Sequence, residues 1–217
     1  MRTAIYAFLI LLLIGGALAL GRAREADGGE PMTDIGADRQ KRSDREAAVA
    51  TFAGGCFWCM EEVFEEVPGV VSAVSGYSGG NVENPTYDQV SAGGTGHAEA
   101  VRVIYDPDRI SYERLLDLFW HNVDPLTPNR QFCDRGNQYR SAIFYRNETQ
   151  KRLAERSKLA IEESGRFEEP IVTEIVPASE FYEAEEYHQD YYKKNPIRYK
   201  FYKWNCGRAQ RLEELWG

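Results

Sequence analysis

The stretch from residue 47 to residue 67 reads AAVATFAGGCFWCMEEVFEEV. It opens with an apolar run that stops at Gly54-Gly55, a pattern that predicts a buried strand followed by a turn. Apolar residues then recur at helical spacing, before a Pro-Gly pair: Met60, Val63, Phe64 and Val67. The stretch therefore predicts a strand, a tight turn and a helix that begins close to Cys56.

The chain beyond this stretch alternates in the same way between β-branched runs and helical stripes. Strands are predicted at 70–77, 97–105, 139–146 and 171–176. Helices are predicted after Ser111, from Asn147 to Gly165, and over 208–216. The segment 124–137 holds two prolines and no periodic pattern, which is typical of a functional loop. Alternation without internal repeats indicates a single α/β or α+β domain.

The N-terminal segment differs in kind from the rest. Arg2 is followed by an apolar run over 4–20, and Ala17-Leu18-Ala19 offers the small residues that a signal peptidase reads. We therefore predict a signal peptide or membrane anchor over 1–20, with cleavage favoured. Residues 21–46 are charged and aperiodic, so a disordered linker is predicted there, followed by a catalytic domain over 47–217. The expected location is exported, either periplasmic or anchored to the outer side of the cytoplasmic membrane.

The bulk composition excludes some classes of function. The formal net charge is −8, whereas nucleic-acid binding requires a basic surface that displaces counterions. Four cysteines occur: Cys56, Cys59, Cys133 and Cys206. They are too few for a disulfide framework, and a single Cys-x-x-Cys does not supply the usual zinc ligands. Redox or nucleophilic use of at least one thiol is the favoured interpretation.

Cys56 follows two glycines and begins the predicted helix. The first N–H groups of a helix are unpaired and the macrodipole is positive there, so we expect a lowered pKa for this thiol. The alternative is that Cys56 is a small buried hydrophobic residue, as most cysteines are. Phe57 and Trp58 point about 100° apart on a helix, so at least one of them should lie near the mouth of the site.

Several motifs occur in a fixed order between residues 51 and 196: GGCFW (54–58), VSGYSGG (74–80), NPTY (84–87), TGHAEAV (95–101), QYRSAI (138–143), YHQDY (187–191) and KNP (194–196). This set resembles the A-type peptide methionine sulfoxide reductases. The fold expected with it is α+β: one domain, a mixed sheet with flanking helices in a ferredoxin-like two-layer α/β roll, and a long aromatic-rich C-terminal coil.

The resemblance implies a role for each matching residue. Cys56 would attack the sulfur of methionine S-sulfoxide and become a sulfenic acid. Phe57 and Trp58 would form the apolar pocket for the substrate methyl group. Glu99 would protonate the sulfoxide oxygen, assisted by hydroxyls and a carboxylate that orients the site: Tyr87, Tyr139 and Asp134. A raised pKa suits a carboxylic acid to this task, because the oxygen leaves only when it is protonated.

The recycling thiol is left open by the sequence. Cys206, in the aromatic-rich tail, is the first choice to resolve the sulfenic acid. Cys59, one helical turn from Cys56, is nearly as favoured, and Cys133 is interpreted as structural. No cofactor and no metal are predicted; His97, His121 and His188 are interpreted as hydrogen-bonding or surface residues. The expected partners are oxidised proteins and a thioredoxin-like reductant, and the expected state is a monomer.

Single features of the sequence also suit three other functions. The motif Cys56-Phe57-Trp58-Cys59 after a strand would suit a thioredoxin-type disulfide oxidoreductase, although no thioredoxin-like βαβ unit precedes it. The Gly-x-Ser-x-Gly around Ser78 would suit a serine hydrolase, but Pro85 breaks the helix that must follow such an elbow. A non-catalytic binding module would not explain why a cysteine, Cys56, follows two glycines at the start of a helix.

Overall fold

The computed structural model describes residues 47–217. The predictions for a leader over 1–20 and a linker over 21–46 lie outside the described residues. Within the described part, no helix has both the length and the apolar character needed to cross a membrane.

The strand, turn and helix predicted from the opening stretch are confirmed. Strand β1 covers Ala48–Gly54 and helix α2 covers Phe57–Glu65. Gly55 makes the turn between them with φ of +80°, a conformation that other residues rarely adopt. A side chain there would also meet Gln131, because an added Cβ would lie 2.4 Å from the Gln131 Cβ atom. The turn therefore sets Cys56 directly at the start of α2.

Six strands form one mixed sheet, ordered β7-β6-β1-β3-β2-β8. Their bounds, apart from β1, are β2 Val70–Ser78, β3 Ala98–Tyr105, β6 Ser141–Tyr145, β7 Glu174–Pro177 and β8 Phe181–Glu183. Strand β6 pairs with β7 in parallel, and the other pairs are antiparallel. The prediction of a mixed sheet with flanking helices is confirmed.

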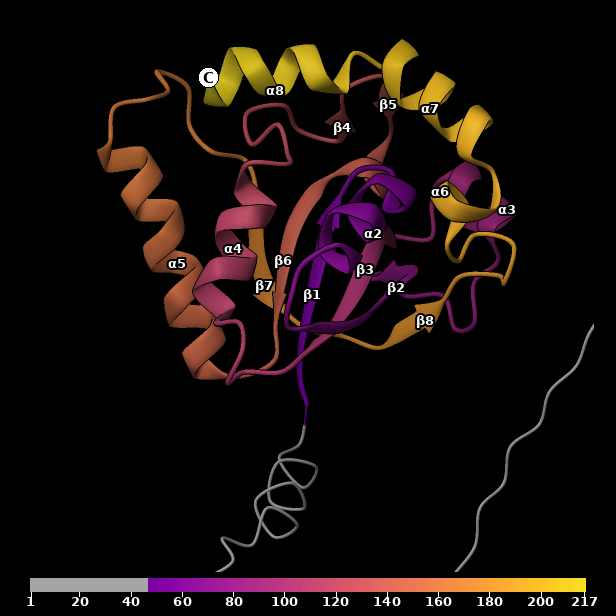
Figure 1. The fold of residues 1–217 in the computed structure, drawn as a ribbon, viewed down its shortest axis with the longest axis horizontal. Coiled ribbons are helices and arrows are strands. Elements are labelled where there is room, and N and C mark those ends of the chain that lie inside the picture. The colour runs from indigo at the N-terminus through magenta and orange to yellow at the C-terminus, as the bar shows by residue number, and fades with distance from the viewer. Residues whose placement is uncertain (1–46) are drawn as a thin grey trace, which may run out of the picture. The chain divides into compact units, whose positions relative to one another are not determined.

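Two further helices join α2 in flanking the sheet, as Figure 1 shows. Helix α4 covers Tyr112–Trp120 and α5 covers Glu148–Glu163. Both predicted N-caps are confirmed, since the side chains of Ser111 and Asn147 accept hydrogen bonds from backbone N–H groups three residues on. The main core, with Phe52, Phe64 and Phe119 at its centre, lies between the sheet and these helices.

The opposite face of the sheet carries a smaller apolar cluster made mainly of alanines. Strand β1 supplies both faces, because alternate side chains of a strand point in opposite directions: Phe52 enters the main core and Ala53 the smaller cluster. The larger side chains are therefore concentrated on the face that the helices cover.

The aromatic-rich tail is helical over 191–205, so the prediction of a long coil there is wrong, whereas the helix predicted over 208–216 is confirmed. The tail forms α6 Tyr191–Lys194, α7 Pro196–Asn205 and α8 Arg208–Trp216, which follow one another along one edge of the domain (Figure 1). Pro196 occupies the first turn of α7, where a missing N–H costs nothing. Tyr199 is buried against α2, so tertiary packing stabilises this helix.

Two segments outside the predicted helices and strands contain regular structure. The Gly-rich loop after β2 includes α3 Tyr87–Ala92, which begins with a capping box between Thr86 and Gln89. The predicted functional loop over 124–137 includes a small hairpin of β4 Arg130–Gln131 and β5 Asp134–Arg135. A 3₁₀ turn, η1, follows at Asn137–Tyr139. These elements matter because they carry Tyr87, Asp134 and Tyr139.

Candidate active site

A small cavity of about 60 Å³ lies at the N-terminus of α2. Eight residues line it: Cys56, Phe57, Trp58, Tyr87, Glu99, Asp134, Tyr139 and Tyr202. Seven of these are the residues predicted for catalysis and substrate binding. The fold brings them together from β3, α2, α3, β5 and η1, which are separated by up to 83 positions in the chain.

Glu99 occupies the helix N-terminus that was expected to stabilise a Cys56 thiolate. The backbone N–H of Phe57 donates a hydrogen bond of 3.0 Å to a Glu99 carboxyl oxygen. Burial raises the pKa of the Cys56 thiol well above its ordinary value, and a hydrogen bond to Cys59 and the nearby Glu99 charge raise it further. The expected lowering of this pKa is therefore not found, since the positive end of α2 faces a carboxyl group instead.

Cys59 holds the lower pKa of the two thiols in α2. A hydrogen bond from Cys56 lowers the pKa of Cys59 to about 6, opposed by burial and assisted by the positive charge of Arg208. Cys56 and Cys59 are both buried, with exposed fractions of 5% and 2%, and neither is in a disulfide. The hydrogen bond between the two thiols raises the pKa of Cys56 and lowers that of Cys59, so the two groups titrate in dependence on each other.

Glu99 has the properties expected of a catalytic acid. Its side chain is almost fully buried on β3, and this burial raises its pKa to about 8 against the lowering effect of the Phe57 N–H. The carboxyl group therefore holds its proton at neutral pH. It faces the same cavity as Cys56, so a group bound there meets a thiol and a proton donor together.

Tyr87 and Tyr139 bring two phenol groups to this cavity from α3 and η1. Burial raises the pKa of Tyr87 to about 12 and raises that of Tyr139 further, with the Glu99 charge adding to both. Both hydroxyls are therefore protonated over the physiological range and are available as hydrogen-bond donors to an oxygen in the cavity.

Phe57 and Trp58 form the apolar wall. Phe57 is fully buried, whereas Trp58 is only half-buried, as expected for adjacent residues at the start of a helix. The Trp58 indole stacks on Tyr191 at 3.7 Å between ring centroids and donates a hydrogen bond of 3.0 Å to His188. His188 also lies 4.9 Å from the Phe57 ring. Residues of the tail thus fix the orientation of the wall.

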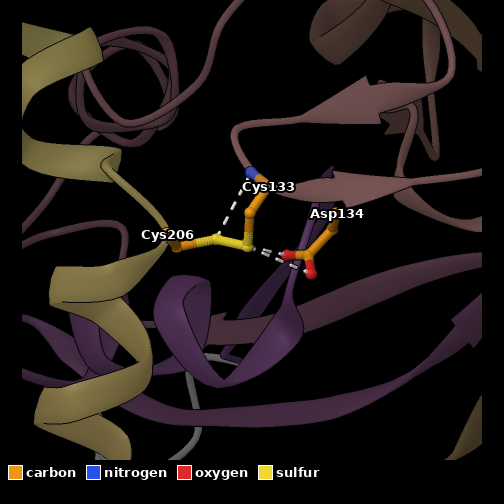
Figure 2. A group of neighbouring side chains, drawn as sticks. All are labelled: Cys133, Asp134 and Cys206. Atoms are coloured by element: carbon orange, nitrogen blue, oxygen red, sulfur yellow. Dashed lines mark hydrogen bonds between the residues drawn. A yellow bond between two sulfur atoms is a disulfide. The ribbon is translucent and has the colours of Figure 1, made fainter.

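Asp134 connects the cavity to a disulfide between Cys133 and Cys206 (Figure 2). The Tyr202 hydroxyl donates a hydrogen bond of 2.5 Å to Asp134, and the Cys206 sulfur lies 4.0 Å from the same carboxyl oxygen. Tyr202 also hydrogen-bonds the Cys56 thiol, which lowers the pKa of Cys56 against the effect of burial. Cys206 is bonded to Cys133 and therefore forms no disulfide with Cys56 in this state.

The described residues include one cluster with metal-ligand chemistry: Cys133, Asp134 and Cys206. Two of its three members are joined in the disulfide, so the cluster offers no thiolate pair in this state. The histidines have other roles: His97 is buried and hydrogen-bonded to backbone groups of Gly80 and Val82, and His121 is hydrogen-bonded to a carbonyl on the surface of α4.

Comparison with known proteins matches this site to a family. The family profile described as "Peptide methionine sulfoxide reductase" matches residues 48–217. The chain belongs to this family. The enzyme described as peptide methionine sulfoxide reductase MsrA of Bacillus subtilis (strain 168) is 56% identical over 169 residues, which cover 78% of this chain and 96% of that protein. That of Halalkalibacterium halodurans is 54% identical over 178 residues, covering 82% and 99%.

Solved structures of peptide methionine sulfoxide reductases have the same fold. Methionine sulfoxide reductase A of Corynebacterium diphtheriae is 35% identical, with a TM-score of 0.64 and coverage of 72% of this chain and 78% of that chain. Reduced Mxr1 of Saccharomyces cerevisiae is 34% identical, with a TM-score of 0.64 and coverage of 70% and 87%. The α+β fold and the family expected from the sequence motifs are therefore confirmed.

Sequence reasoning missed two contributors to this reductase site. Tyr202 lines the cavity and links Cys56 to Asp134, and His188 holds the Trp58 indole. The tail holds many aromatic residues, and no local pattern singles out Tyr202 among them. The Gly-x-Ser-x-Gly around Ser78 has no nucleophile geometry: Ser78 ends β2, and its hydroxyl donates to the Glu180 carbonyl.

Proposed function

We propose that this protein reduces methionine S-sulfoxide in peptides and proteins to methionine, with Cys56 as the nucleophile and Glu99 as the acid. The observation that carries the proposal is the cavity itself, where a thiol, a protonated carboxyl group and two phenols face an apolar wall. Membership of the peptide methionine sulfoxide reductase family supports the substrate, and the choice of the S epimer rests on that family alone.

The first half of the reaction transfers the sulfoxide oxygen. Glu99 gives a proton to that oxygen, which Tyr87 and Tyr139 also hydrogen-bond, and the sulfur of Cys56 attacks the substrate sulfur as its proton passes to Cys59. The sulfur–oxygen bond of the substrate breaks, the oxygen then bonds to the Cys56 sulfur, and methionine leaves as the bond between Cys56 and the substrate sulfur breaks. Cys56 is oxidised by two electrons to a sulfenic acid. Phe57 and Trp58 exclude water around the substrate methyl group.

The second half restores Cys56. Cys59 is the thiol in contact with Cys56, so we propose that it attacks the sulfenic acid, forms the Cys56–Cys59 disulfide and releases the oxygen as water. This disulfide would be buried. Cys206 lies on the other side of Asp134 and Tyr202, and as a thiolate it would open the Cys56–Cys59 bond and then pair with Cys133. A thioredoxin-like dithiol finally reduces the exposed Cys133–Cys206 bond, without a bound cofactor.

The activity is tested with peptides that carry one methionine S-sulfoxide or one R-sulfoxide, and with dithiothreitol as the reductant. We expect conversion of the S epimer alone, and the Ser78→Ala variant should behave like the wild type. The disulfides are then trapped by alkylation and mapped by mass spectrometry after one turnover without a reductant. A trapped Cys56–Cys59 bond in the Cys206→Ser variant supports Cys59 as the resolving residue, and its absence rejects that step.

The N-terminal segment supports a proposal on location. A positive residue, an apolar run over 4–20 and the small residues at Ala17-Leu18-Ala19 favour export with cleavage after Ala19. The mass of the protein recovered from the exported fraction of cells tests this. A mature chain that begins at Leu20 supports cleavage, an intact chain in the membrane fraction supports an uncleaved anchor, and an intact chain in the cytosol contradicts both.

A further inference from the structure

Helix α7 exposes three large apolar side chains on one face. Ile197, Phe201 and Trp204 are 86%, 65% and 77% exposed, and their i, i+4, i+7 spacing aligns them along the helix. The rings of Phe201 and Trp204 lie 6.1 Å apart, so the side chains form a continuous surface, here called the α7 stripe. A row of exposed aliphatic and aromatic side chains is typical of a binding surface.

The opposite face of the same helix touches the catalytic thiols. Tyr199 and Tyr202 hydrogen-bond Cys59 and Cys56, respectively. The residue that caps α7 at its C-terminal end is Cys206, two positions beyond Trp204. Its disulfide partner Cys133 is exposed. One short helix therefore connects the α7 stripe, the surface disulfide and the buried pair.

The charge around the α7 stripe is positive, although the chain as a whole carries −8. The stretch 191–205 contains no acidic residue and five basic ones: Lys193, Lys194, Arg198, Lys200 and Lys203. Three of the five pair with glutamates or aspartates elsewhere. Arg198 and Lys200 are exposed and have no hydrogen bond or ion pair with any other residue in the described part of the chain.

We infer that the α7 stripe is the docking surface for the protein dithiol that reduces the Cys133–Cys206 disulfide, and that this partner presents an apolar patch rimmed by acidic residues. The inference rests on the proposed function and names the partner's site. A thiolate of the docked partner bonds to the exposed Cys133 sulfur, and the bond to Cys206 breaks. The partner's second thiol then breaks the mixed disulfide, so the partner leaves oxidised and two electrons remain on Cys133 and Cys206.

The dimensions suit a single interface. A helix of ten residues is about 15 Å long, and a standard protein interface buries about 800 Å² on each partner. A footprint of that size covers both the stripe and the disulfide at the end of the helix. Trp204 would serve as an aromatic anchor of the interface, and such anchors supply much of the affinity. The two unpaired cations beside it favour an acidic partner, because complementary charge speeds association.

The test compares two reductants on one enzyme. The variants Trp204→Ser and Phe201→Ser, singly and together, are assayed with purified thioredoxin, kept reduced by NADPH and thioredoxin reductase, and separately with dithiothreitol. We expect the KM for thioredoxin to rise about 10- to 30-fold in the double variant. Turnover supported by dithiothreitol should stay within about twofold of the wild type, because a small dithiol needs no docking surface.

The matched control is Leu159→Ser, which removes a half-exposed apolar side chain from α5 and should change neither assay. An unchanged KM for thioredoxin in the double variant overturns the inference. A sedimentation coefficient that differs between the double variant and the wild type also overturns it, because the stripe would then bind a second copy of the chain. The same holds if the double variant loses binding to anionic phospholipid vesicles while its KM for thioredoxin is unchanged. If the wild type fails with dithiothreitol as well, it is the proposed function that fails.

The charge is tested separately with Arg198→Glu and Lys200→Glu. These substitutions should raise the KM for thioredoxin at low salt, and the difference from the wild type should shrink as ionic strength rises and screens the charges. A KM that falls, or one that does not respond to salt, contradicts an acidic rim on the partner.

Discussion

The two cysteine pairs of this protein differ in their surroundings more than in their chemistry. Cys56 and Cys59 lie three positions apart at the N-terminus of α2, are buried, and have pKa values that move in opposite directions. Cys133 and Cys206 come from a hairpin and from the end of α7, are 73 positions apart, and are joined at the surface. The buried pair suits chemistry that must exclude water, whereas the surface pair suits exchange with another protein. Asp134 and Tyr202 lie between them.

The largest expected effect separates the nucleophile from the surface pair. In a single turnover without a reductant, Cys56→Ser should lose at least about 1,000-fold in rate, because no other group attacks the sulfoxide sulfur. Cys133→Ser should still complete that turnover and fail only in repeated turnovers with thioredoxin. Quench-flow analysis of sulfoxide consumption measures both. Equal losses of rate in the two variants would mean that the two cysteine pairs do not have separate roles in sulfoxide reduction and in recycling.

The next effect concerns the acid of the buried site. Glu99→Gln should lower kcat by about 100- to 10,000-fold, the usual contribution of general acid catalysis. In the wild type the acid must be protonated, and its pKa is raised to about 8, so the rate should decline as the pH rises through about 8. The variant should lack that decline. A pH–rate profile of kcat/KM for both proteins checks this, and a persisting decline in the variant would assign it to another group.

The Cys133–Cys206 disulfide should contribute to the stability of the domain, whereas a bond between Cys56 and Cys59 would close only one turn of helix. A disulfide that closes a loop of this length stabilises a domain by about 2–4 kcal/mol. Cys133→Ser should therefore lower the free energy of unfolding by this amount. The same loss should follow when dithiothreitol is added to the wild type, and the variant should not respond to the reductant. Urea unfolding followed by tryptophan fluorescence gives all four values; a reductant-sensitive variant would place the labile bond elsewhere.

The smallest effects should distinguish the two thiols of the buried pair. Tyr202 hydrogen-bonds Cys56 and Tyr199 hydrogen-bonds Cys59, and each bond lowers the pKa of its own thiol. Tyr202→Phe should raise the pKa of Cys56 and reduce kcat about 3- to 10-fold, the effect of one lost hydrogen bond. Tyr199→Phe should shift Cys59 instead. Alkylation rates measured against pH, with the labelled residue identified by mass spectrometry, compare the two; identical shifts would mean that the thiols titrate as one unit.

The local sequence was sufficient for much of the fold. A continuous apolar run predicted β1, and segments rich in β-branched residues predicted β2 and β3. Ser111 and Asn147 begin their helices as expected because capping depends on neighbouring residues. Helix α8 was predicted, but α6 and α7 were not, because α7 gains its stability from burying Tyr199 against α2. Helix α3 was missed as well, since it has only six residues inside a loop rich in glycine.

The sequence by itself determined most of the residues that line the candidate active site. Ordered motifs identified the family and predicted a nucleophile, an acid and an apolar wall, since each is a residue type in a fixed local setting. Only the tertiary structure decided the electrostatics and the pairing of thiols. Glu99 lies 43 positions from Cys56 and accepts the hydrogen bond from the Phe57 N–H. This N–H therefore does not stabilise a Cys56 thiolate, and the pKa of Cys56 is raised. Cys206 meets Cys133 because α7 folds over α2 and ends at the hairpin, and such contacts depend on packing across the whole domain.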